Sequence, residues 1–178
     1  MKRLLFAALL VMPLMCGLVS CSKETRPEPD SLTTNWGWTF NVAVPSPNSS
    51  LEMTGNTVKL AELLSTTHKD KEKYVHEVAV QSVSSDVKIK GLQAGQTIKS
   101  LSLKPSDSKI QSLELGQITG TGDDISISDN AVFQFLSKLG NSVCTNKSIS
   151  LNLTASSGTQ TISGVTVVIT MRTRVSWR

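Results

Sequence analysis

The chain has 178 residues, 39% of them hydrophobic and 4% aromatic, with a formal net charge of +4. This length fits one domain with one hydrophobic core. Lys2 and Arg3 supply two of the 18 basic side chains, and both lie in a segment that we expect to be removed. The mature chain then keeps 16 basic against 14 acidic side chains, and so small an excess gives no reason to expect a nucleic-acid partner.

The first twenty-one residues have the pattern of an export signal. Lys2 and Arg3 precede an apolar run from Leu4 to Val19, which is too short to span a bilayer comfortably. The sequence Leu18-Val19-Ser20-Cys21 resembles a bacterial lipobox. That resemblance implies cleavage before Cys21, thioether lipidation of Cys21, acylation of its amino group, and stable attachment to a membrane by several acyl chains. The alternative is an ordinary secretory signal cut at another position.

Residues 1–20 are therefore expected to be a signal peptide, 21–35 a lipidated N-terminus and flexible tether, and 36–178 one folded domain. Cys144 is the single thiol left after processing, which excludes an intramolecular disulfide. A lone thiol of this kind is usually a small buried side chain.

The folded domain begins with a predicted strand. Trp36, Trp38, Phe40, Val42 and Val44 occupy every second position, and Pro45 follows them. This alternation gives the strand one buried face.

Short elements follow this first strand. Val58 to Leu64 predicts one or two helical turns, and a charged loop runs from His68 to Lys73. Further strands are predicted at Val75–Val83, Val87–Ile89, Ile98–Leu103, Ile110–Leu115 and Ile125–Ile127. Such short strands between turn signals are typical of a β-sandwich or barrel.

A second helix and two strands complete the domain. Ser128 or Asp129 can cap a helix with Val132, Phe133, Leu136 and Leu139 on one stripe, and Gly140 can end it. Alternating residues then predict strands from Ile149 to Ala155 and from Val165 to Trp177. The last strand is long, so we expect it to bend between sheets or to run along an edge. The fold class is mostly β: an antiparallel β-sandwich with one or two short helices.

Catalytic motifs are not supported by their surroundings. Ser128-Asp129-Asn130 matches the S-D-N element of penicillin-binding enzymes, and Ser85/Lys88 and Ser106/Lys109 match S-x-x-K, but K-T-G is absent. His68 and His76 have no metal-binding spacing. We therefore expect no enzyme activity, no catalytic residue, no cofactor and no metal. Asp123, Asp124 and Asp129 could gather around calcium, although aspartates beside glycine usually form turns.

Two features leave room for glycan binding. Trp36 and Trp38 share a strand face and could stack on sugars, although their continuity with Phe40 favours burial. Arg172 and Arg174 share the opposite parity on the last strand and could meet acidic groups of envelope glycans. The polar face of an ordinary strand is the alternative interpretation of the arginines.

Cys21-Ser22-Lys23-Glu24, the polar tether and the all-β body resemble small lipoproteins of Bacteroidetes-type bacteria. Asp30-Ser31-Leu32 is similar to the O-glycosylation sequon of those bacteria, which implies a glycan on Ser31. The resemblance implies a cell-envelope protein, lipid-anchored to the outer membrane, on either its surface or its periplasmic face. We expect a structural or protein-interaction module, and a glycan-binding lipoprotein is the alternative.

Overall fold

The computed structural model describes residues 30–178, so the predicted signal peptide, the predicted lipidation site Cys21 and most of the predicted tether lie outside the described residues. Within residues 30–178, no helix is long and apolar enough to cross a membrane. In chain order the elements are β1 (Ser31–Val44), β2 (Ser50–Thr54), β3 (Val58–Lys59), α1 (Leu60–Leu63), the 3₁₀ helix η1 (Thr66–Tyr74), β4 (Val75–Val80), the 3₁₀ turn η2 (Ser82–Ser84), β5 (Asp86–Lys90), β6 (Thr97–Pro105), β7 (Leu113–Thr119), β8 (Ile125–Ile127), α2 (Asn130–Asn146), β9 (Ser148–Ile149), β10 (Leu151–Ser157) and β11 (Ile162–Trp177).

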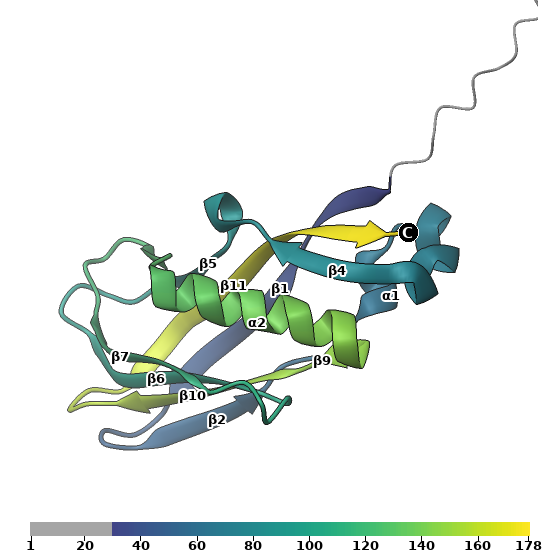
Figure 1. The fold of residues 1–178 in the computed structure, drawn as a ribbon. Coiled ribbons are helices and arrows are strands. Elements are labelled where there is room, and N and C mark those ends of the chain that lie inside the picture. The colour runs from purple at the N-terminus through teal and green to yellow at the C-terminus, as the bar shows by residue number, and fades with distance from the viewer. Residues whose placement is uncertain (1–29) are drawn as a thin grey trace, which may run out of the picture.

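Two antiparallel sheets and one long helix enclose the core, which confirms the predicted mostly-β class. The first sheet has the order β1-β11-β5-β8, with β4 also paired to β11, and the second has the order β2-β10-β6-β7. Strands β3 and β9 form a separate short ribbon. Helix α2 lies across the front of the molecule, between β4 and the second sheet (Figure 1). Buried apolar side chains come from both sheets and both α-helices and include Leu60, Ile89, Leu103, Leu136, Leu153 and Ile169.

Strand β11 is an interior strand, so the expectation of an edge or a bend between sheets was wrong. One side of β11 pairs with β1 along nearly its full length. The other side pairs with two successive strands, β5 along residues 166–170 and β4 along residues 173–177. Turn η2 separates these two strands. At this break in strand pairing, the buried Ser85 hydroxyl replaces a backbone partner. It accepts from the Arg172 N–H (3.0 Å) and donates to the Gln81 carbonyl (2.7 Å).

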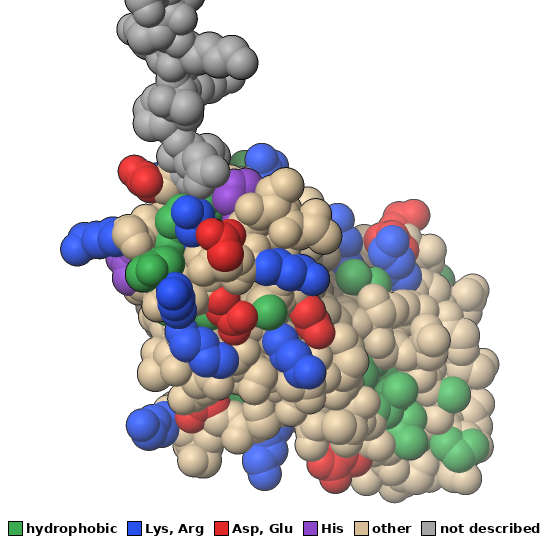
Figure 2. Space-filling view, turned by 90° about the vertical axis from the view of Figure 1, so that its right-hand side faces the viewer, with side chains coloured by type: hydrophobic (Ala, Val, Ile, Leu, Met, Phe, Trp, Pro, Cys, Tyr) green, Lys and Arg blue, Asp and Glu red, His purple; other side chains and the backbone are tan. Residues whose placement is uncertain are grey.

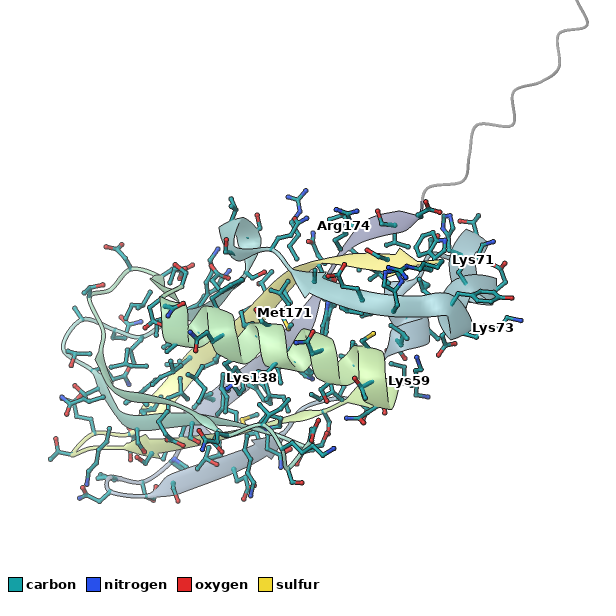
Figure 3. The ribbon with its side chains drawn as sticks, viewed as in Figure 1. Lys59, Lys71, Lys73, Lys138, Met171 and Arg174 are labelled. Carbon is teal, nitrogen blue, oxygen red and sulfur yellow. The ribbon has the colours of Figure 1, made fainter. Side chains whose placement is uncertain are left out.

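The alternation predicted for β11 is confirmed, since odd positions from Val165 to Val175 are buried. Figure 3 shows both kinds of position: Met171 lies behind α2, and Arg174 lies on the outer side of the sheet. Several predicted boundaries differ. Strand β1 begins at Ser31 rather than Trp36, because its first residues pair with the end of β11. Strand β4 ends at Val80, and β7 begins at Leu113. Strand β2 was not predicted.

Helix α2 has 17 residues and continues past Gly140, so the predicted C-terminus was wrong. It ends at Asn146, and Lys147 adopts the left-handed conformation (φ 65°). Gly140 is needed for packing instead, since a Cβ there would lie 2.8 Å from the Val78 carbonyl oxygen of β4. Of the two predicted caps, Ser128 and Asp129, it is Asp129 that caps the helix, accepting from the Val132 N–H (2.8 Å). Within the stripe, Phe133 is only half-buried, and the neighbouring Phe135 takes the core position.

Candidate interaction surface

Strand β1 forms one edge of the first sheet, and its open side has no neighbouring strand within the described residues. It has 14 residues and pairs only with β11. Within residues 30–178, no backbone hydrogen bond from another element reaches this open side. An edge of this kind presents unpaired N–H and C=O groups that another chain can use.

The parity of the ladder shows which residues of β1 face the open side. The Trp177 N–H donates to the Asp30 carbonyl oxygen (2.9 Å), and Ser31 pairs with Ser176. Because an antiparallel ladder alternates bonded and unbonded pairs, even-numbered β1 residues bond to β11 and odd-numbered residues face away. The Gln81 N–H donates to the Arg172 carbonyl (2.8 Å) on the other side of β11, as this parity requires. The open edge therefore consists of the N–H and C=O groups of Ser31, Thr33, Asn35, Gly37, Thr39 and Asn41.

This edge lacks the usual protection against pairing. Between Ser31 and Val44 there is no charged residue and no proline, and a register shift is confined to the Val42–Val44 end. The other edges are shorter or charged: β8 has three residues, β2 includes Glu52 and β7 includes Glu114. Natural edges are usually blocked by lysine, proline or bulges. Strand β1 is thus the long, unblocked edge of the described domain.

Gly37 lies at the middle of this edge. A Cβ at this position would lie only 1.8 Å from the Ile169 carbonyl oxygen, so the two strands can meet here only with glycine. The close approach keeps β1 attached to β11 and leaves a position without a side chain in the centre of the exposed row.

The tryptophans do not form an exposed aromatic platform. Trp38 is 2% exposed, and its indole N–H donates to the Asn56 carbonyl (2.8 Å). Trp36 is half-buried, packs edge-on against Trp38 with ring centroids 5.4 Å apart, and donates to the Thr173 hydroxyl (3.0 Å). The prediction that these indoles pack inward is confirmed for Trp38 and holds in part for Trp36.

The arginines lie on the opposite face of the same sheet. Arg172 and Arg174 are exposed, so no single site contains both the tryptophans and the arginines. Arg172 borders a hollow of about 410 Å³ whose other lining residues are Asn35, Val83, Ser84, Asp86, Lys88 and Thr170. Asp86 is occupied by Lys88 (3.5 Å) and by the Ser126 hydroxyl (2.8 Å). Within residues 30–178, no ion pair involves the Arg172 guanidinium, which leaves it available to an acidic group.

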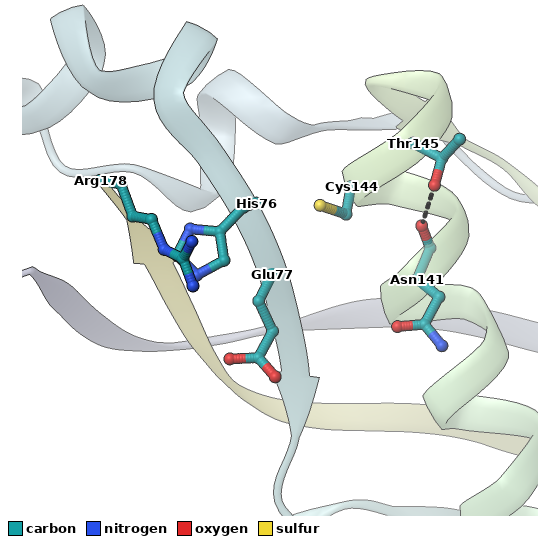
Figure 4. Close-up of a pocket in the computed structure, with 6 residues that line it drawn as sticks. All are labelled: His76, Glu77, Asn141, Cys144, Thr145 and Arg178. Atoms are coloured by element: carbon teal, nitrogen blue, oxygen red, sulfur yellow. Dashed lines mark hydrogen bonds between the residues drawn. The ribbon is translucent and has the colours of Figure 1, made fainter.

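A second hollow, of about 540 Å³, separates β4 from the C-terminal half of α2. His76 and Glu77 of β4 line it together with Cys144 of α2, whose thiol extends toward β4, and Arg178 lies beside His76 (Figure 4). Burial raises the pKa of the Cys144 thiol, against a smaller lowering by Lys147. No hydrogen bond in the described region joins the thiol to His76 or Glu77. An activated nucleophile needs such a base contact and a lowered pKa, so this hollow does not have the arrangement of a thiol active site.

The end of the molecule near α1 and η1 is strongly charged but mixed in sign. Figure 2 shows Lys, Arg, Asp and Glu side chains interspersed there, below the grey segment. Segment η1 alone carries Lys69, Asp70, Lys71, Glu72 and Lys73. His68 bonds to the Ser65 hydroxyl (2.6 Å) and lies against the Trp177 ring, so it has a structural role in this loop.

The remaining predicted sites are separated by the fold. Asp124 pairs with Lys90 (3.9 Å), whereas Asp129 caps α2, and no group of three metal-binding side chains occurs among residues 30–178. The three aspartates thus do not gather into a calcium site there. Ser31 is half-buried at the start of β1. In Ser128-Asp129-Asn130, Asp129 is the N-cap of α2 and Asn130 is its first residue. This segment therefore starts a helix.

Comparisons with known proteins give no family for this chain. No known family description matches it, and no curated protein sequence matches it. One solved structure, from Desmodium yellow mottle tymovirus, aligns over 82% of this chain and 89% of that chain, with 10% sequence identity and a TM-score of 0.34. The two-sheet architecture is established by the strand pairing described above.

Proposed function

We propose that this chain is a lipid-anchored, non-catalytic module of the cell envelope that binds a protein partner by strand addition at β1. The observation that carries the proposal is the long, uncharged and unpaired edge from Ser31 to Asn41. A strand added there gains main-chain hydrogen bonds at each odd-numbered residue. The lipobox-like Leu18 to Cys21 supports the anchor, which holds the edge close to other envelope proteins.

Photo-crosslinking from the edge tests this proposal. A photoreactive residue at Thr33 should capture a protein in membranes of the native organism, and one at Thr166 should not. Thr166 lies on the same face of the sheet but on the interior strand β11.

The blocking variant is Thr39→Pro. The Thr39 N–H points to the open side, so proline there removes an edge donor without breaking the β11 ladder. The adduct from Thr33 should disappear in this variant while the tryptophan emission of the folded protein stays unchanged. Equal capture from Thr33 and Thr166, or an adduct that survives Thr39→Pro, would contradict strand addition.

Glycan binding is the second candidate, and the unpaired Arg172 guanidinium in its polar hollow favours it. Guanidinium and carboxylate groups form strong bidentate pairs, so the hollow fits an acidic sugar better than a neutral one. Binding to a panel of uronate and neutral oligosaccharides tests this. Arg172→Gln should remove the preference for acidic glycans, and Lys104→Gln, an exposed change on the other sheet, should leave it. Indifference to Arg172→Gln would reject this site.

A further inference from the structure

We propose that the protein that pairs with β1 is a second copy of this chain, joined antiparallel about a two-fold axis at Gly37. This inference rests on the proposed strand addition and names its partner. Symmetric dimers use the same surface on both copies, so each residue of the edge must suit its symmetry mate.

The outward residues of β1 are self-complementary about Gly37. An antiparallel register centred there places Asn35 opposite Thr39 of the second copy and Thr33 opposite its Asn41. Every outward pair flanking Gly37 from Thr33 to Asn41 thus joins a threonine hydroxyl to an asparagine amide, which can hydrogen-bond across strands. The fold already contains one such contact, because the Thr166 hydroxyl donates to the Asn41 side-chain oxygen (3.3 Å) across β11 and β1.

The backbone parity agrees with the same axis. All odd-numbered residues of β1 face the open side, so Gly37 and its symmetry mate would form a hydrogen-bonded pair at the axis. Because residue 37 is glycine, no side chains of the two copies meet at the axis itself. The edge has no charge to repel its own copy, whereas β2 and β7 carry Glu52 and Glu114.

Cysteine crosslinking in membranes tests the register. Full-length chains carrying Cys144→Ser and either Asn35→Cys or Thr39→Cys are produced together with different tags and treated with a mild oxidant. Opposed residues of a hydrogen-bonded pair lie about 5.5 Å apart at Cα, within reach of a disulfide. The expected product is a mixed disulfide of the two tagged chains, and each variant alone should give little dimer. A chain with Thr166→Cys, exposing a thiol on the interior strand, is the matched control.

A charge series provides a second measurement that does not depend on the thiols. Asn35→Lys and Thr39→Lys in one chain place lysine opposite lysine, so the dimer should dissociate while tryptophan emission shows an intact fold. Mixing this chain with one that carries glutamate at both positions should restore a heterodimer. Ser50→Lys and Thr54→Lys in one chain add the same two charges at exposed positions of β2 in the other sheet, and this control should leave the dimer unchanged.

The outcomes separate this inference from the proposed function. Crosslinking of Asn35→Cys with Thr39→Cys no better than the Thr166→Cys control would overturn self-pairing. If Thr33 then captures a different protein in a manner sensitive to Thr39→Pro, self-pairing is wrong and strand addition stands. If β1 yields no adduct with any protein, both are wrong.

Discussion

Ile169→Ala should strongly destabilise the fold, whereas Thr170→Ala should change stability very little. Ile169 is 1% exposed and lies on the interior strand, paired with Trp38 on β1 and Val87 on β5. Losing three buried carbon groups at about 0.8 kcal/mol each removes about 2.4 kcal/mol of transfer free energy. Neighbours on both sides hold the site open, so the cavity should raise the cost to about 4 kcal/mol, inside the usual range of about 2–5.

Urea unfolding monitored by tryptophan emission measures this difference directly. Trp38 and Trp177 are buried and Trp36 is half-buried, so their emission should shift to longer wavelength as the core opens. Thr170 points to the opposite face, and its truncation should cost no more than about 0.5 kcal/mol. Both variants should keep the same dependence on urea concentration. Equal losses for the two substitutions would refute the assignment of odd-numbered β11 residues to the core.

Three further predictions concern other parts of the chain. Cys21→Ala should release the protein from the membrane fraction and abolish labelling by a fatty-acid analogue, and retention after a carbonate wash would show that the anchor lies elsewhere. Gly140→Ala should destabilise the protein by about 1–3 kcal/mol, because the new Cβ meets the β4 backbone, whereas Ser137→Ala on the same helix should be nearly neutral in the same urea assay. Hydrogen bonds from the Ser142 hydroxyl and then from the Lys109 backbone lower the pKa of Asp107, so its stabilising effect is present above the ordinary aspartate pKa and lost as pH falls through the lowered value. Asp107→Asn should flatten this part of an acid-unfolding curve, and an unchanged curve would contradict the assignment.

The sequence predicted those elements whose burial follows a simple period. Residues from Trp36 to Val44 and from Val165 to Trp177 alternate, and both became strands with the expected face inward. Ser128 or Asp129 was predicted to cap a helix from its position before the apolar stripe, and Asp129 forms the cap. In each case the local pattern and the tertiary packing require the same residue types.

The errors arose where a distant neighbour decides the local structure. Gly140 resembles a helix end by itself, but β4 approaches α2 there and needs the glycine inside the helix. Ser31 to Asn35 have weak strand character and extend β1 because the end of β11 bonds to them. The alternation of Leu51 and Met53 with polar residues could have revealed β2.

The candidate surface was only partly visible in the sequence. The alternation of β1 identified its buried face, and the parity of Arg172 and Arg174 placed them together outside. The sequence could not show that β1 is an edge strand, because this depends on whether any strand pairs with the second side of β1. The open edge of β1 could therefore be recognised only from the strand order, and no sequence motif indicates it.

The position of β11 between β1 and β4 also determines when the first sheet can form during folding. Trp36 and Thr173, which bond to each other, are 137 positions apart in sequence. Folds dominated by such distant contacts fold slowly, since a long loop must close before any pairing is gained. Strands β1, β4 and β5 all pair with β11, which is the last strand in the sequence. They cannot be joined into one sheet before β11 pairs with them, so we expect the first sheet to form later than the second.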